Sequence, residues 1–141
     1  MTGIKGKEQG RRAQQEFKAA LAEAGFFVIG KGISTPGTDI IALDGSGHAL
    51  FVEVKATVGN TVTINYRQVA ALRRDARDYM DRVKNYSVAM MAAGRFPGEK
   101  WALCMKPPNY GRWKVRNNGS LDHKGVVEWL KTRSKDGFAA T

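Results

Sequence analysis

Apolar residues recur at every third or fourth position in two segments of the chain, and this spacing predicts an α-helix in each. The first helix is expected over residues 10–24 and ends at Gly25. The second is expected over residues 65–84. Its apolar stripe consists of Val69, Leu72, Ala76, Met80 and Val83. A shorter third helix is expected over residues 122–132.

Short apolar runs bounded by turn residues predict the strands. These runs cover residues 26–29, 38–43, 48–55, 87–92, 100–105 and 113–115. The turn Asp44-Gly45-Ser46-Gly47 joins the second and third runs into a hairpin. Residues 30–37 have loop composition, and residues 135–141 are expected to form a frayed tail. This order of elements predicts an α/β fold in which helices flank a mixed central β-sheet.

The length of 141 residues suits a single domain, 1–141. The charge is unusual, because 23 Lys and Arg face 13 Asp and Glu, which gives a net charge of +10. Polyanions are the usual partners of such a chain, and nucleic acid is the foremost of them. The alternative is a basic surface that is only solvated.

Several protein classes are excluded by composition. One cysteine, Cys104, excludes a disulfide scaffold, and two histidines exclude a His-rich metal site. We find no apolar run long enough to span a membrane and no signal peptide at the start. We therefore expect a cytoplasmic protein in a reducing environment, without a membrane partner.

The segment 39–55 is acidic within this basic chain. Glu53 and Lys55 are two residues apart on a predicted strand and therefore share a face. The predicted hairpin brings Asp39 onto the neighbouring strand. Two carboxylates and an ammonium group arranged in this way suit phosphodiester hydrolysis, because Mg²⁺ prefers carboxylate oxygens. A structural salt bridge is the alternative, and the residues alone leave both open.

At these positions the sequence resembles the PD-(D/E)XK nuclease superfamily. Asp39 matches its first acid, and Glu53-Val54-Lys55 matches its E-x-K motif. The surroundings resemble the archaeal-type Holliday junction resolvases and their viral relatives. The shared features are a helix ending in Gly-Phe, a loop Ser, D-I-I-A, a Gly turn, V-E-V-K, and a helix opened by Tyr66 and Gln68.

The resemblance covers about residues 10–105, and it implies a restriction-endonuclease-like core there. A basic N-terminal arm (1–9) would precede this core, and a C-terminal extension (106–141) would follow it. The implied activity is metal-dependent cleavage of branched DNA that leaves 5′-phosphate ends. The implied assembly is a homodimer, whose two-fold symmetry would match that of a four-way junction.

The resemblance also assigns roles to single residues. Asp39 and Glu53 would hold one or two Mg²⁺ ions, for which Mn²⁺ substitutes, with the backbone carbonyl of Val54 as a further ligand. Lys55 would activate or orient the attacking water, and Ser34 would contact a phosphate. Two alternatives stay open: a related enzyme that cleaves or nicks duplex DNA, and a DNA-binding protein without catalysis.

A third acid of the family lies on its first helix, and the matching position here is Gln14. Glu16 and Glu8 are the alternatives, although they lie roughly 160° and 120° around the helix from Gln14. An amide carbonyl is a weaker ligand than a carboxylate, so we expect Gln14 to occupy this position and to bind the metal or its water more weakly than an acid would.

The remaining candidates are basic or polar residues for contacts with DNA phosphates. They are Lys5, Lys7, Arg11, Arg12, Lys31, Arg67, Gln68, Arg73, Arg112, Lys114 and Arg116. Helix capping is the alternative role for Gln68. Arg74 and Arg77 are expected to pair with neighbouring aspartates instead.

Overall fold

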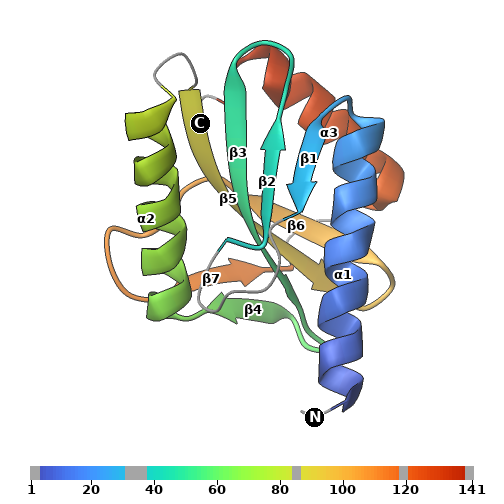
Figure 1. The fold of residues 1–141 in the computed structure, drawn as a ribbon. Coiled ribbons are helices and arrows are strands. Elements are labelled where there is room, and N and C mark those ends of the chain that lie inside the picture. The colour runs from blue at the N-terminus through green and yellow to red at the C-terminus, as the bar shows by residue number, and fades with distance from the viewer. Residues whose placement is uncertain (1–3, 31–37, 84–86, 118–120, 139–141) are drawn as a thin grey trace.

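The computed structural model describes residues 4–30, 38–83, 87–117 and 121–138. Figure 1 shows the arrangement of the elements within these residues. In chain order they are α1 (Ile4–Glu23), β1 (Phe27–Gly30), β2 (Ile40–Leu43), β3 (His48–Ala56), β4 (Thr61–Ile64), α2 (Tyr66–Arg82), β5 (Ser87–Phe96), β6 (Lys100–Cys104), β7 (Trp113–Arg116) and α3 (His123–Lys135).

The main sheet has five strands in the order β1-β2-β3-β5-β6. The central pair, β3 and β5, is parallel, and the other neighbours are antiparallel. This mixed sheet with flanking helices confirms the predicted fold class. The sequence reading missed β4, which pairs with β7 in a separate two-stranded ribbon.

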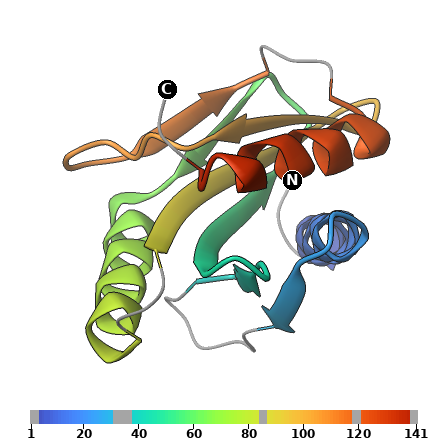
Figure 2. The same ribbon diagram turned by 90° about the horizontal axis from the view of Figure 1, so that it is seen from above.

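The two faces of the sheet carry separate hydrophobic cores. Successive residues of β3 point to opposite faces, so Val52 packs with Phe17 of α1 and Leu130 of α3, while Phe51 packs with Leu72 of α2. Figure 2 shows α2 on the opposite side of the sheet from α1. Because both faces are covered, β3 is an almost continuously buried strand.

The first helix differs from its prediction. It begins at Ile4, so residues 4–9 are helical and do not form the expected arm. Gly10 was read as a helix start, but it lies inside the helix. The Glu8–Arg11 ion pair, at i,i+3 spacing, supports the additional turns.

The C-terminal end also differs from its prediction. Phe138 is buried, and its ring packs against Phe26 and His48, so the chain is docked as far as this residue. The expected frayed tail over residues 135–141 is therefore wrong for its described part. No helix in the described parts of the chain is long and apolar enough to cross a membrane.

Candidate active site

Asp39 and Glu53 face each other at one end of the β2–β3 pair. Ile40 lies opposite Val52 in the antiparallel register, and the next pair outward is Asp39 and Glu53. The backbone N–H of Val54 donates a hydrogen bond of 2.9 Å to Asp39 Oδ2. The hairpin thus brings the two predicted acids together, as their spacing predicts.

The two carboxyl groups are in an electrostatically unfavourable position. Glu53 is only 2 % exposed, and its Oε1 has no hydrogen-bond partner among the described residues. Burial, followed by the negative charge of Asp39, raises the pKa of Glu53 to about 9. Burial also raises the pKa of Asp39, although the Val54 N–H and the nearby Lys55 and Lys18 oppose this shift.

Lys55 lies one pleat beyond Glu53 on β3 and is held by the start of α2. Its Nζ donates a long hydrogen bond of 3.4 Å to Gln68 Oε1. Gln68 also completes the capping box of α2 with Asn65, and its Oε1 accepts the Asn65 N–H at 3.2 Å. Helix capping, the alternative to the DNA contact expected for Gln68, is what the structure shows, and the same side chain contacts the candidate catalytic lysine.

The helix α1 carries Gln14, the residue expected at the third position of the site. Lys18 lies one turn after Gln14, and its positive charge lowers the pKa of Asp39. Gln14 is half-buried. Both alternatives for the third acid are engaged elsewhere, because Glu16 pairs with Arg95 at 2.6 Å and Glu8 pairs with Arg11.

Asp39 and Glu53 fit a divalent cation. Glu53 is buried, Asp39 is half-buried, and one oxygen of Glu53 has no hydrogen-bond partner among the described residues. A bound cation would favour the ionised form of both carboxyls, whose pKa values are raised primarily by burial. In the described residues, no cluster of three or more His, Cys, Asp or Glu side chains is arranged as a metal site. The carboxylate ligands that we expect at this site are therefore Asp39 and Glu53.

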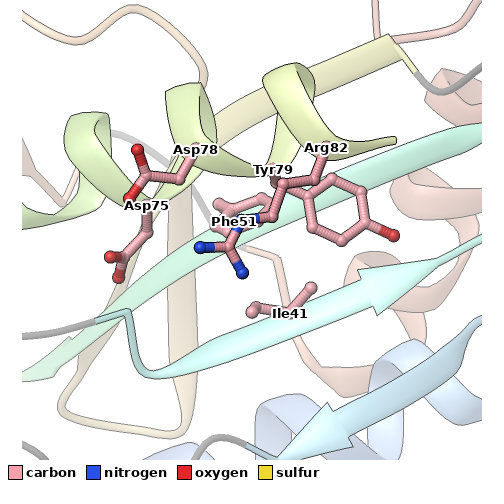
Figure 3. A pocket seen from close by; sticks show the side chains of 6 residues that line it. All are labelled: Ile41, Phe51, Asp75, Asp78, Tyr79 and Arg82. Carbon is pink, nitrogen blue, oxygen red and sulfur yellow. The ribbon is translucent and has the colours of Figure 1, made fainter. Parts of the chain in front are cut away.

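Sequence reasoning missed Asp75 on α2. Its Oδ2 accepts hydrogen bonds from the backbone N of Thr38 at 3.1 Å and from Thr38 Oγ1 at 2.7 Å. Figure 3 shows Asp75 beside Asp78, on the side of α2 that faces Ile41 and Phe51. The aspartates of this helix interleave with arginines, a pattern that was read only as solvated ion pairs, so the sequence held no signal for this contact.

The candidate DNA-contacting residues lie in several places. Lys7, Arg11 and Arg12 are exposed on α1. Lys114 and Arg116 are exposed on one face of the β4–β7 ribbon, while Trp113 and Val115 are buried on the other. Arg112 is exposed just before β7. Lys31, Ser34 and the side chain of Lys5 lie outside the described residues.

Arg67 and Arg73, the two candidate arginines on α2, differ from each other in their contacts. Arg67 is exposed and its guanidinium lies over the ring of Tyr66. Arg73 donates to the backbone carbonyls of Pro108 and Asn109, at 2.6 and 3.1 Å. Arg73 therefore holds the segment between β6 and β7, which is a structural role that the sequence did not indicate.

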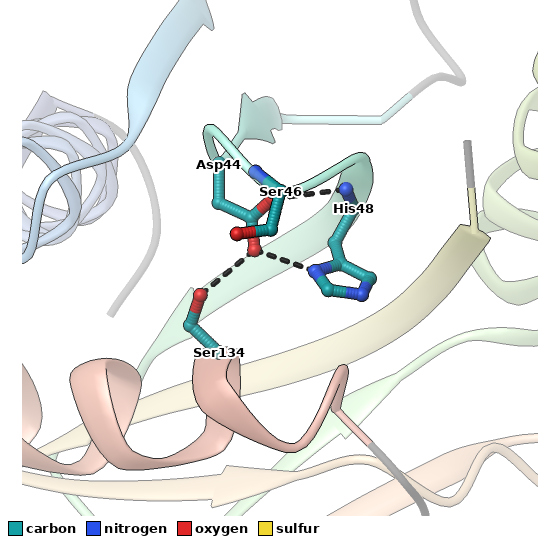
Figure 4. A network of polar contacts seen from close by, with 4 residues as sticks. All are labelled: Asp44, Ser46, His48 and Ser134. Carbon is teal, nitrogen blue, oxygen red and sulfur yellow. Dashed lines mark hydrogen bonds and ion pairs between the residues drawn. The ribbon is translucent and has the colours of Figure 1, made fainter. Parts of the chain in front are cut away.

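Asp44 forms a second polar cluster at the other end of the β2–β3 pair (Figure 4). Its Oδ1 accepts the backbone N–H groups of Ser46 and His48, both at 2.9 Å. Its Oδ2 accepts His48 Nδ1 and Ser134 Oγ, both at 2.7 Å. The predicted turn role of Asp44 is confirmed, and the same carboxylate also ties α3 to the turn.

Comparisons with known proteins agree with this architecture. The sequence profile of the family described as "Archaeal holliday junction resolvase (hjc)" matches residues 5–130. This match extends beyond the resemblance noted at residues 10–105 and takes in most of the expected C-terminal extension. No curated protein matches the chain significantly.

Two solved structures are similar to this one. The Holliday junction resolvase Hjc of the archaeal hyperthermophile Archaeoglobus fulgidus has a TM-score of 0.62 and 20% identity, over 91% of this chain and 95% of that one. The bacterial homing endonuclease I-Ssp6803I has a TM-score of 0.50 and 12% identity, over 99% of this chain and 100% of that one. At these identities the likeness shows a shared fold.

Proposed function

The chain belongs to the archaeal Holliday junction resolvase family, and we propose that it is a metal-dependent endonuclease that cleaves four-way DNA junctions. The observation that carries this proposal is the Asp39–Glu53 pair, in which Glu53 is buried, with Lys55 beside it. A buried carboxyl that faces a second carboxyl, and that has an oxygen without a partner among the described residues, is unfavourable for stability. Such groups are typical of a chemical site.

Asp39, Glu53 and the backbone carbonyl of Val54 would hold Mg²⁺, for which Mn²⁺ substitutes. When bound, the metal would lower the pKa of a water molecule and neutralise charge on the phosphate. Lys55, held by Gln68, would orient that water or donate to a phosphate oxygen. Ser34 would contact a neighbouring phosphate, and the products would carry 5′-phosphate ends.

Two exposed basic surfaces would supply affinity for the DNA backbone. One lies on α1 and contains Lys7, Arg11 and Arg12, and the other is the Lys114 and Arg116 face of the β4–β7 ribbon. A net charge of +10 makes binding strongly dependent on salt, because each phosphate contact releases counterions.

A homodimer would place two such sites on one junction. The face of β1 and β2 on the α2 side supports this assembly, because Phe27 is 68 % and Ile29 is 39 % exposed there. A two-fold contact with a second copy would cover this apolar face. Light scattering that gives twice the mass of 15.5 kDa would support the dimer, and a mass of one chain would contradict it.

The test is a cleavage assay on a four-way junction and on a linear duplex of the same sequence, in Mg²⁺ and with chelator. Selective, chelator-sensitive cutting of the junction, with 5′-phosphate ends, is expected. Equal cutting of both substrates in excess competitor DNA would favour the duplex-cleaving alternative. Binding without cutting in Mg²⁺ or Mn²⁺ would favour the non-catalytic alternative.

A further inference from the structure

Asp75 makes a long-range contact with the residue that directly precedes Asp39. Thr38 is 3% exposed, and both its backbone N–H and its hydroxyl donate to one oxygen of Asp75, at 3.1 and 2.7 Å. Only 13% of the Asp75 side chain is exposed. Two charge-assisted hydrogen bonds to a mostly buried carboxylate form a strong local constraint.

We propose that Asp75 is a positioning residue that sets the place of Asp39 in the active site. This inference rests on the proposed function for its catalytic consequence. Asp39 is held from two sides: α2 holds the preceding residue through Asp75, and β3 holds the carboxylate itself through the Val54 N–H, at 2.9 Å. The two contacts together fix the backbone and the side chain of Asp39 relative to Glu53.

The electrostatics show that Asp75 is not placed to relieve the acid pair. Its negative charge is among the causes that raise the pKa of Glu53. A carboxylate at this position therefore works against ionisation of the site while it holds Thr38. Its geometric contact, rather than its charge, is the property that benefits Asp39.

Asp78 provides a matched control on the same helix. It lines the same cavity of about 200 Å³ as Asp75, it is exposed, and it makes no hydrogen bond to Thr38 within the described part of the chain. Asp78→Ala thus removes a nearby negative charge without removing the contact. Asp75→Asn is the conservative variant, because its amide oxygen still accepts from Thr38.

The first experiment is amide hydrogen exchange without metal or DNA. Asp75→Ala is expected to speed exchange of the Thr38 N–H and also of the Val54 N–H, by about tenfold relative to other amides of β3. The Val54 effect is decisive, because that N–H bonds to Asp39 and not to Asp75. Asp75→Asn and Asp78→Ala are expected to leave the Val54 N–H within about twofold of the wild type.

The second experiment measures Mn²⁺ affinity by calorimetry and single-turnover cleavage of a four-way junction. Asp75→Ala is expected to weaken Mn²⁺ binding and to lower the cleavage rate by about tenfold or more, as loss of an outer partner of a metal ligand does. The junction Kd is expected to change little. Asp75→Asn should restore both quantities, and Thr38→Val should add little to Asp75→Ala, because both act through one contact.

An unchanged Val54 exchange rate and an unchanged Mn²⁺ affinity in Asp75→Ala would overturn the inference. Equal effects of Asp78→Ala would overturn it as well, since they would indicate a general effect of helix charge. If the wild type cleaved no DNA, the proposed function would fail. The exchange and Mn²⁺ measurements would still decide whether Asp75 positions Asp39.

Discussion

Each end of the β2–β3 pair carries carboxyl groups that are partly or fully buried. The two ends differ in how completely these groups are hydrogen-bonded. At the turn, Asp44 accepts four hydrogen bonds from three residues. At the other end, Asp39 and Glu53 face each other, and one oxygen of Glu53 has no partner among the described residues.

The pKa values follow this difference. Burial alone would raise the pKa of Asp44, but the donors from Ser134, His48 and Ser46 together lower it. The pKa values of Asp39 and Glu53 are both raised, primarily by burial. A carboxylate with all its hydrogen bonds formed stabilises the fold. A carboxyl pair with an unpartnered oxygen lowers stability and leaves that oxygen free to bind a cation.

The largest expected effect is a loss of cleavage, without a loss of DNA binding, when Asp39 of the acid pair is changed. Asp39→Asn removes one charge but keeps the shape, so we expect cleavage to fall by about 10³-fold or more. Junction binding, measured by gel shift in the absence of metal, should persist. A variant that cleaves at the wild-type rate would show that the site is assigned wrongly.

The matching change at the other end should act on stability instead. Asp44→Ala leaves four donors without their acceptor, and we expect a loss of about 2–4 kcal/mol in the free energy of unfolding. Urea titration measures this loss. Because the pKa of Asp44 is lowered, its stabilisation is present above its ordinary pKa and disappears as the pH falls through the folded value.

Asp44→Asn is the control for this comparison. It keeps an oxygen for the two backbone N–H groups, so its loss should be smaller than that of Asp44→Ala. Folded Asp44→Ala protein should still cleave at a rate near that of the wild type. A specific loss of cleavage in fully folded protein would contradict the structural role.

We expect Glu53→Gln to change the free energy of unfolding by a smaller amount. The change is a gain in stability, whereas Asp44→Ala is expected to cause a loss. With a folded pKa of about 9, Glu53 retains a proton that the unfolded chain loses above about 4.5, so wild-type stability falls as the pH rises between these values. Glutamine does not titrate, and we expect the variant to be about 1–2 kcal/mol more stable at pH 8.

Thermal unfolding at pH 4, 6 and 8 measures this difference. The gap in Tm between Glu53→Gln and the wild type should grow with pH, and it should narrow when Mg²⁺ is added, because only the wild type gains a full ligand set. The variant should not cleave. A gap that is the same at all three pH values would show that the Glu53 carboxyl does not carry the destabilisation.

The sequence predicted the elements that have a strong periodic pattern. The Val69–Leu72–Ala76 stripe placed α2 within one or two residues of its observed bounds, and the Asp-Gly turn placed the β2–β3 hairpin. Short elements without a pattern were missed. The strand β4 (Thr61–Ile64) has only four residues, and it is stabilised by pairing with β7, a contact that no local signal encodes.

The same limit applies to the site. The proximity of Asp39, Glu53 and Lys55 was predictable because all three lie on one hairpin. The contact of Asp75 with Thr38 joins positions 37 residues apart, and that of Arg73 with Pro108 joins positions 35 apart. Such contacts depend on how α2 packs on the sheet, and the helix pattern alone does not specify it.

The smallest expected effect tests whether α1 contributes to the acid pair at all. Gln14 is half-buried one turn before Lys18, whose charge reaches Asp39. A carboxylate at this position would add a third acid beside the pair, so Gln14→Glu should tighten Mn²⁺ binding by about fivefold, because affinity for hard cations rises with ligand charge. Cleavage should be kept or raised.

Gln15→Glu is the matched control, since Gln15 is exposed on the same helix, and it should leave Mn²⁺ affinity unchanged. If both variants bound Mn²⁺ alike, or if Gln14→Glu lost its activity, the third position of the site would have to come from an element other than α1.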